Sequence, residues 1–279
     1  MPCIPVKIYY PGRGFPSLSV TGHHCALRCK HCNARYLQHM IPILSPEALI
    51  EFAKRNEGKI KGFLLSGGST PEGKVPLRRF VGAVRWIVEN TSLLVNIHTG
   101  IIDDEDIEYL EEMSPHHISF DVIGSTETIR EVLGIPRTRE DYFHALDLLE
   151  DSSLHYSPHI IAGLHFGKVL GEYAIVDKLK NLRRYHSLVL LTLIPTKGTP
   201  MENVSVDREA VVEFFEYALE NIPPEKVVLG CMRPRNFHDL ENLCLSYSCR
   251  GMVLPSLRTI KKMREIGIPV ETRDTCCVF

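Results

Sequence analysis

The sequence predicts an α/β fold of the TIM type, a (β/α)8 barrel that is full or nearly full, on two observations. Short apolar, β-branched segments alternate with amphipathic segments along the chain, the pattern of a parallel sheet with crossover helices. We count eight expected strands, each followed by an expected helix, and a closed barrel requires that number. The nearest alternative is an open, partial barrel of about six strands.

The expected strands are short apolar segments: Ser17–Thr21, Gly62–Ser66, Leu93–His98, His117–Val122, Tyr156–Ala162, Ser187–Ile194, Lys226–Leu229 and Arg250–Leu254. The first expected helix opens with Ser45-Pro46-Glu47, a capping serine followed by proline at the first helical position. The other expected helices cover Leu77–Glu89, Asp104–Met113, Arg139–Leu149, Glu172–Leu182, Asp207–Glu220, Phe237–Leu243 and Ser256–Ile266. We expect residues 1–279 to form a single domain, with 1–16 as an N-terminal extension and 268–279 as a tail that returns to the barrel mouth.

The composition is that of a globular protein, with 44% hydrophobic and 24% charged residues. Lys plus Arg number 32 and Asp plus Glu number 34, so the net charge favours neither a nucleic acid nor a membrane as partner. The first residues do not form a secretory signal, and the longest apolar run, around 188–194, is too short to span a bilayer. Nine cysteines without an export signal favour metal or catalytic thiols over disulfides, and predict the cytoplasm.

Cys25, Cys29 and Cys32 lie in one short loop directly after the first expected strand. Barrel enzymes place their chemistry at this carboxyl end of the strands. Thiolates are the ligands that iron–sulfur clusters prefer, and three of them leave one iron of a cuboid cluster open. A zinc site completed by a nearby histidine is the alternative, but no second pair of ligands lies close by. The C-x3-C-x2-C spacing resembles that of the radical S-adenosylmethionine superfamily.

This resemblance implies a [4Fe–4S] cluster, bound S-adenosylmethionine and a 5′-deoxyadenosyl radical that abstracts hydrogen from an unactivated C–H bond. The segment Gly67-Gly68-Ser69, at the end of the second expected strand, resembles the family segment whose backbone holds the amino group of the methionine moiety. Glycine suits that role because backbone can approach a ligand without an intervening Cβ. His31 stands where the family usually has an aromatic residue, and its ring can still pack against adenine.

Polar residues recur at the carboxyl ends of the expected strands: Asn96, His98, Asp121, His159, Thr196 and Lys197. Each histidine alone is adequately explained as a hydrogen-bonded core or loop residue. Their recurrence at one mouth predicts that some of them line a pocket. The cofactor-binding residues that we expect are Gly67, Gly68, Ser69, His31, Asn33, His98 and Asp121.

A second cysteine set is expected at the same mouth. Cys231 follows the seventh expected strand, and Cys276 and Cys277 lie in the tail. The last expected helix, of about eleven residues, is ~16 Å long, and the following dozen or so residues can extend ~40 Å. The tail can therefore bring its thiols to Cys231. Three thiolates there predict an auxiliary iron–sulfur cluster, provided that a turn lets both adjacent cysteines face it.

The remaining cysteines have other expected roles. Cys244 and Cys249 fall on an expected helix and at a strand start, and we expect them to be buried as small apolar residues. Cys3 is a candidate for a fourth ligand of the auxiliary cluster.

Segments along nearly the whole chain resemble a biotin-synthase-like group of archaeal enzymes that supplies one component of a two-protein lipoyl synthase. Among them are His98-Thr99-Gly100 and Cys231-Met232-Arg233-Pro234-Arg235. The resemblance implies sulfur insertion at C6 and C8 of a protein-bound octanoyl chain, with the auxiliary cluster as the sulfur donor. The implied partners are an octanoylated lipoyl-domain carrier protein, a second radical enzyme and an electron donor.

Three alternatives remain open at this point. The same barrel can serve biotin-type sulfur insertion into a free small molecule, or a radical methylation. A non-catalytic iron–sulfur scaffold or redox regulator is the third, and the Gly67-Gly68 segment argues against it because a scaffold needs no site for methionine.

Overall fold

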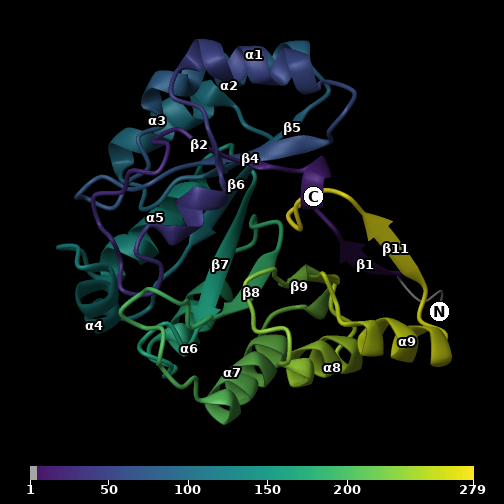
Figure 1. The fold of residues 1–279 in the computed structure, drawn as a ribbon. Helices are drawn as coiled ribbons and strands as arrows, with labels where there is room; N and C mark the ends of the chain where they lie inside the picture. The colour runs from purple at the N-terminus through teal and green to yellow at the C-terminus, as the bar shows by residue number, and fades with distance from the viewer. Residues whose placement is uncertain (1–4) are drawn as a thin grey trace.

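A single curled sheet of eleven strands forms the framework of the protein (Figure 1). The structure is a computed structural model and describes residues 5–279. The strand order is β11-β1-β10-β9-β8-β7-β6-β5-β4-β2-β3. Every pairing between these strands is parallel.

The eight expected strands are all present and lie side by side in chain order. They are β2 (Ser17–Ser19), β4 (Gly62–Ser66), β5 (Leu94–His98), β6 (His117–Asp121), β7 (Tyr156–Ala162), β8 (Leu188–Thr192), β9 (Val227–Leu229) and β10 (Gly251–Val253). Because each is joined to the next by a crossover connection, their carboxyl ends share one edge of the curled sheet. The expectation of a TIM-type α/β barrel is confirmed in this respect.

Three further strands were not predicted, and they keep the described sheet from closing through hydrogen bonds. β1 (Val6–Tyr9) pairs with β10, and β11 (Val270–Arg273) pairs with β1. β3 (Ile41–Pro42) pairs with the other edge, at β2. β1 and β3 thus occupy the two edges that β10 and β2 would need in order to pair with each other. The sheet is therefore a curled, open half-barrel, with β3 and β11 as its free edges.

Helices follow the strands and cover the outer, convex side of the sheet (Figure 1). Those that were expected are α1 (Pro46–Asn56), α2 (Val81–Asn90), α3 (Asp104–Met113), α5 (Arg139–Asp151), α6 (Glu172–Leu179), α7 (Arg208–Asn221), α8 (His238–Ser246) and α9 (Leu257–Glu265). Helix α1 begins as predicted, because Ser45 Oγ accepts a hydrogen bond of 3.2 Å from Ala48 N.

Several short helical elements escaped the sequence analysis. α4 (Thr126–Thr128) continues directly into the π-helical segment η4 (Ile129–Leu133). The 3₁₀ segments that were not expected are η1 (Gly12–Gly14), η2 (Arg35–His39) and η5 (Pro224–Lys226), whereas η3 (Arg78–Phe80) lies within the helix expected over Leu77–Glu89. Among these, η4 and η2 matter for the site because they flank the cysteine loop.

The segment after β11 turns into the concave side of the sheet, and Figure 1 shows the chain ending there. Its residues join an apolar cluster built from the inner faces of strands at one side of the barrel. That cluster contains Tyr9, Val189, Leu191, Val228, Val253, Cys277 and Val278. Side chains fill the interior of a small barrel, and here the returning tail contributes part of that filling.

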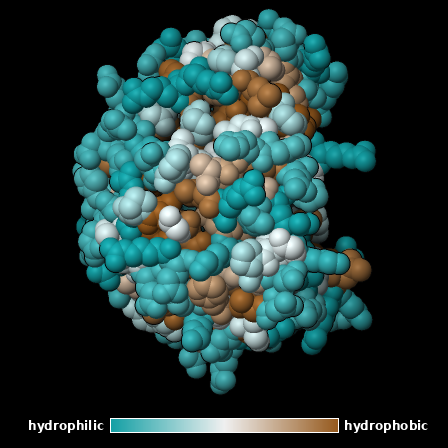
Figure 2. Space-filling view, turned by 60° about the vertical axis from the view of Figure 1, so that its left-hand side comes forward, coloured by the Kyte–Doolittle hydropathy of each residue, from teal (hydrophilic) through white to brown (hydrophobic). Residues whose placement is uncertain are grey.

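The face shown in Figure 2 is largely hydrophilic, with apolar residues gathered in patches between the polar ones. Within residues 5–279, no helix is both long and apolar enough to cross a membrane.

Candidate functional site

The loop that carries the first cysteine set follows β2 at the carboxyl edge of the sheet. Backbone turns hold it: the amide nitrogens of Cys32 and Asn33 both lie close to Cys29 O, at 3.1 and 2.7 Å. Asn33 adopts a left-handed conformation with φ of 45°. The loop also rests on the unpredicted segment η4, because Lys30 N donates to Val132 O at 2.9 Å.

The thiols of Cys29 and Cys32 lie close to each other in this loop. Cys29 and Cys32 share a hydrogen bond between their side chains, which lowers the pKa of Cys32 to about 4 and raises that of Cys29. The Nδ1 atom of His31, between them, is buried and has no hydrogen-bond partner in the described part of the chain. Neighbouring thiols suit an iron–sulfur cluster, and the unsatisfied ring nitrogen suits a polar cofactor bound next to that cluster.

Gly67-Gly68-Ser69 continues from β4 and packs directly against the cysteine loop. A Cβ added at Gly68 would lie 2.7 Å from Cys25 Cα and would clash with His24 O. Ser69 N donates to Cys25 Sγ at 3.4 Å. We expected glycine here because a ligand approaches the backbone, but at Gly68 it is the protein's own cysteine loop that excludes a side chain. The segment therefore fixes Cys25 as well as lining the site.

An ion pair lies at the ends of the next two strands. His98 Nε2 on β5 is 3.1 Å from Asp121 Oδ2 on β6. Burial alone would lower the pKa of His98, but the charge of Asp121 raises it. Burial opposes ionisation of Asp121 as well, yet His98 brings the pKa of Asp121 down to about 2. The charge of His31, in the cysteine loop, contributes a smaller lowering of the pKa of Asp121.

His159 lies next to the same pair, since it is in register with Asp121 on the neighbouring strand. Burial lowers the pKa of His159 to about 4, so its imidazole is neutral near neutral pH. The two other expected strand-end residues, Thr196 and Lys197, do not join this group. Thr196 bonds to Tyr36 of η2 at 3.0 Å, and Lys197 is exposed.

Cys231 and the two tail cysteines lie in one region of the structure. The amide nitrogen of Phe279 donates to Cys276 O at 3.2 Å, closing the turn that the sequence analysis required. A hydrogen bond from Cys277 lowers the pKa of Cys276 to about 7 and raises that of Cys277. Cys231 is exposed as a residue, and the protein that surrounds its thiol and the charge of Cys276 both raise the pKa of that thiol. The three thiols thus lie close enough to affect one another's ionisation.

Neighbouring groups extend this second set. Thr275 Oγ1 is buried and finds no hydrogen-bond partner among residues 5–279. Asn96 Nδ2 donates to Cys276 Sγ at 3.5 Å. Cys244 and Cys249 are buried in the outer core, as expected, and hydrogen-bond to each other. Cys3 lies outside the described residues.

Arg233 has a role that the sequence analysis missed. Its side chain is 1% exposed and its Nη2 lies 2.9 Å from Glu241 Oε1, whose side chain is 3% exposed. Nη1 of the same guanidinium donates to Gly230 O at 2.5 Å, next to Cys231. Glu241 in turn accepts from Ser256 and Thr259. This buried ion pair fixes the backbone that carries Cys231.

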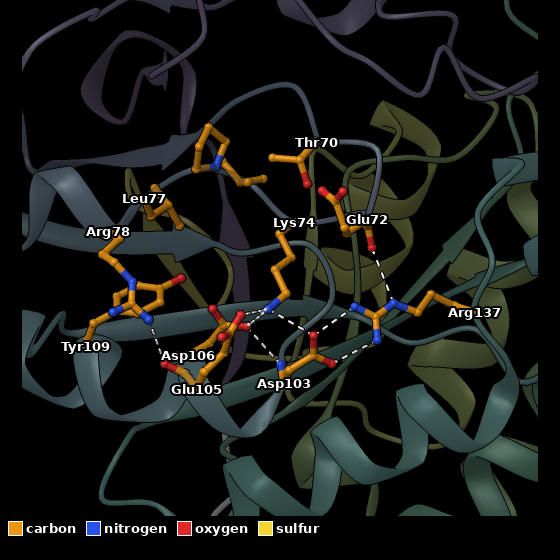
Figure 3. Close-up of a pocket in the computed structure, with 12 residues that line it drawn as sticks. Thr70, Glu72, Lys74, Leu77, Arg78, Asp103, Glu105, Asp106, Tyr109 and Arg137 are labelled. Atoms are coloured by element: carbon orange, nitrogen blue, oxygen red, sulfur yellow. Dashed lines mark hydrogen bonds and ion pairs between the residues drawn. The ribbon is translucent and has the colours of Figure 1, made fainter.

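A charged cavity of about 370 Å³ adjoins the segment after Ser69 (Figure 3). Lys74 projects into it and pairs with Asp103 at 2.9 Å and Asp106 at 2.7 Å. Burial alone would lower the pKa of Lys74, but hydrogen bonds to these carboxylates raise it. Arg137 forms two bonds to Asp103, at 3.0 and 2.8 Å. The network joins the loops that follow β4, β5 and β6.

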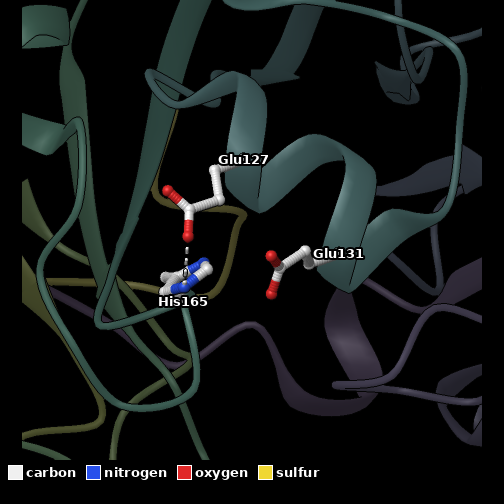
Figure 4. Close-up of side chains that lie close together, drawn as sticks. All are labelled: Glu127, Glu131 and His165. Carbon is white, nitrogen blue, oxygen red and sulfur yellow. Dashed lines mark ion pairs between the residues drawn. The ribbon is translucent and has the colours of Figure 1, made fainter.

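A second polar group lies on the rim beside η4 (Figure 4). His165 Nε2 is 3.7 Å from Glu127 Oε1, and Glu131 lies next to them. Thr128 Oγ1 bonds to His165 Nδ1 at 3.2 Å and orients the ring. Both carboxylates are exposed, so this is an ion pair at the surface of the rim.

Several solved structures have a similar fold. Methylornithine synthase (PylB) superposes with a TM-score of 0.61 at 13% identity, covering 97% of this chain and 84% of that one. The FeFe-hydrogenase maturase HydG from Carboxydothermus hydrogenoformans gives 0.61 at 17% identity, covering 96% and 68%. HMG-CoA lyase from Brucella melitensis gives 0.53 at 11% identity, covering 94% and 93%. At these identities the likeness is one of fold.

Sequence comparison is more specific about the family. No curated protein matches the chain in sequence. The family description "Radical SAM superfamily" matches residues 19–168, more than half of the chain, from β2 through the loop after β7. That span contains the cysteine triplet, the glycine segment and the His98–Asp121 pair. The chain therefore belongs to the radical S-adenosylmethionine superfamily.

Proposed function

We propose that this protein inserts sulfur into the octanoyl chain of a lipoyl carrier protein, as one component of a lipoyl synthase. In this proposal Cys25, Cys29 and Cys32 hold the radical [4Fe–4S] cluster, and Cys231, Cys276 and Cys277 hold an auxiliary cluster that supplies the sulfur. The observation that carries the proposal is the return of the tail into the barrel, where Cys276 meets Asn96 on β5.

The residues between the two cysteine sets support a single substrate site that both sets adjoin. Burial lowers the pKa of His98, and the charges of Asp121 and, to a smaller extent, Cys276 raise it, which supports a position of His98 near the second set. Asp121 responds to His31 of the first loop. A substrate carbon held beside the His98–Asp121 pair would therefore have one cysteine set on each side. Sulfur insertion needs this arrangement, because the carbon activated at one site must reach sulfur at the other.

The chain's own residues have definite tasks in this proposal. When bound, S-adenosylmethionine and its cluster supply a 5′-deoxyadenosyl radical that removes hydrogen from an unactivated carbon. Gly67, Gly68 and Ser69 would hold the methionine end, since Ser69 N already points at Cys25. His31 offers its buried Nδ1 to the bound cofactor.

The proposed partners follow from the substrate. An octanoylated lipoyl-domain protein must present its chain at the carboxyl edge of the sheet. A second radical enzyme would share the two insertions, at C6 and C8, and an electron donor would reduce the radical cluster. Thiols that must stay reduced for metal binding favour the cytoplasm as the place of action.

Mass spectrometry of an octanoylated lipoyl domain tests the proposal. The anaerobically reconstituted protein is incubated with the domain, S-adenosylmethionine and a reductant, with and without the second radical enzyme. We expect the acyl chain to gain sulfur mass, and the Cys25→Ala protein to leave it unchanged. If 5′-deoxyadenosine forms while the acyl chain gains no sulfur under either condition, the proposal is wrong and another radical reaction takes place on this barrel.

A further inference from the structure

Asn96 is a residue of the barrel wall whose side chain hydrogen-bonds to a sulfur atom of the returning tail. It lies in the middle of β5 and is 1% exposed. Its Nδ2 is 3.5 Å from Cys276 Sγ, although 180 positions separate the two residues in the chain. An amide nitrogen at this distance from sulfur donates a hydrogen bond to it.

Ser119 contacts this amide from behind. Ser119 Oγ on β6 lies 2.9 Å from the amide nitrogen and 3.1 Å from the amide oxygen of Asn96. Ser119 is itself buried, at 3% exposure. The amide nitrogen carries two hydrogens, so one can serve Ser119 while the other serves Cys276. Two strands of the wall thus hold a donor aimed at the tail.

Further groups around Cys276 favour negative charge on its sulfur. Its sulfur accepts hydrogen bonds from Cys277 and from the backbone of Val278 as well as from Asn96. His98, two residues beyond Asn96 on β5, interacts with the charge of Cys276. Asn96 differs from Cys277 and Val278 because it comes from the wall of the barrel and not from the tail, and from His98 because its side chain hydrogen-bonds directly to Cys276 Sγ.

We propose that Asn96 is a positioning residue for the auxiliary cluster: its amide hydrogen bond to Cys276 anchors this ligand in the barrel and raises the cluster's reduction potential. The inference rests on the proposed function in one respect, since it takes Cys276 as a cluster ligand. Its physical basis is that donors to ligating sulfur stabilise the more negative, reduced cluster.

The decisive experiment compares the midpoint potential of the auxiliary cluster alone between proteins with and without a substitution of Asn96. The full chain carrying Cys25→Ala, Cys29→Ala and Cys32→Ala provides the background, because only the second cysteine set can then bind iron. Iron content is determined after anaerobic reconstitution, and the midpoint potential is obtained from a redox titration followed by electron paramagnetic resonance. Neither measurement requires turnover.

The Asn96→Leu and Asn96→Asp variants separate an electrostatic role from a merely structural one. Leucine has a similar size and no donor, so we expect the potential to shift to a more negative value. Aspartate brings a carboxylate next to the sulfur, so the shift should be larger in the same direction. A role confined to packing would not produce this order, because aspartate is the closer match to asparagine in shape. Asn181→Leu, on an exposed amide that bonds only to Asp177 O, is the matched control.

The possible outcomes are distinguishable. If the background protein binds no iron at its second set, the auxiliary cluster fails and the proposed function fails with it. If it binds iron and the potential of Asn96→Leu and Asn96→Asp equals that of the background, only the role of Asn96 is overturned. Should leucine prevent folding, Asn96→Ser keeps a polar group for Ser119 but is too short to reach Cys276, and it should give the same negative shift.

Discussion

Gly68 lies directly against Cys25, so closely that a Cβ on Gly68 would stand 2.7 Å from Cys25 Cα. The contact joins the end of β4 to the loop after β2. It explains why this position excludes any side chain without reference to a ligand. The same contact makes the backbone that would bind methionine and the loop that would bind iron one rigid unit.

Substitution of Gly68 by alanine should therefore disturb the radical cluster. The added methyl group must push the cysteine loop away from β4, and we expect iron content and cluster absorbance after reconstitution to fall by at least about half, since a site loosened by as little as ~1 Å loses function. Gly82→Ala is the matched control, because a Cβ at Gly82, in α2, meets nothing within 4 Å. Equal iron content in the two variants would contradict this reading of the contact.

Loss of Glu241 should destabilise the protein strongly. Glu241→Ala leaves the buried guanidinium of Arg233 without its carboxylate, and breaking a buried pair in this way costs about 3–5 kcal/mol. Urea unfolding of the variant and the wild type measures the difference in free energy. The exposed Lys261–Glu265 pair provides the comparison, and Glu265→Ala should cost less than about 1 kcal/mol. A small effect of Glu241→Ala would mean that Arg233 reaches water when its partner is removed.

The stability of the protein should depend on pH through Glu172. This carboxyl, 5% exposed at the start of α6, accepts a hydrogen bond from Gly163 N at 2.9 Å. Burial raises its pKa to about 7, from 4.5 for a free glutamate side chain. Between these values the folded protein binds more protons than the unfolded chain, so the stability falls as pH rises, by up to ~3 kcal/mol. Above pH 7 the contribution of this group becomes constant.

Glu172→Gln removes that titration. The stability difference between wild type and variant, measured by urea unfolding at several pH values from about 5 to about 8, should change in favour of the variant as pH rises. Glu265→Gln, at an exposed position, should show no such trend. A difference that stays constant over this range for Glu172→Gln would show that Glu172 titrates normally in the folded protein.

The parts of the fold that could be predicted are those with a strong local pattern. All eight barrel strands carry apolar or β-branched runs, and Ser45-Pro46-Glu47 has the chemistry of a helix start. β11 was missed because Val-Glu-Thr-Arg is an exposed edge strand with almost no apolar signal. β3 has only two residues, and α4 with η4 forms a short helix whose π-helical geometry no periodicity indicates.

Within the site, spacing predicted the first cysteine set, and chain reach predicted the return of the tail. Contacts between distant residues could not be predicted. The contact of Asn96 with Cys276 and that of Arg233 with Glu241 produce no periodic pattern in the sequence. Asn96 did stand out as a polar residue in an apolar strand, the one signal available. The reason for glycine at Gly68 was also beyond sequence, because it depends on where the cysteine loop folds back.

The second cysteine set should bind iron independently of the two buried cysteines of the outer core. Cys244 and Cys249 bond to each other away from the barrel mouth. The Cys244→Ala/Cys249→Ala protein should therefore retain the iron content of the wild type. If this variant loses half of the iron, Cys244 and Cys249 are themselves cluster ligands, and the assignment of the auxiliary ligands to the second cysteine set is wrong.

Iron and sulfide content after anaerobic reconstitution tests the central claim, that one barrel holds two clusters, most directly. The wild type should bind about eight irons per chain, and Cys231→Ala/Cys276→Ala/Cys277→Ala should bind about four, as two and one [4Fe–4S] clusters require. The radical cluster should remain in that variant with its own spectrum. About four irons in both proteins would contradict the account, because the tail would then carry no cluster.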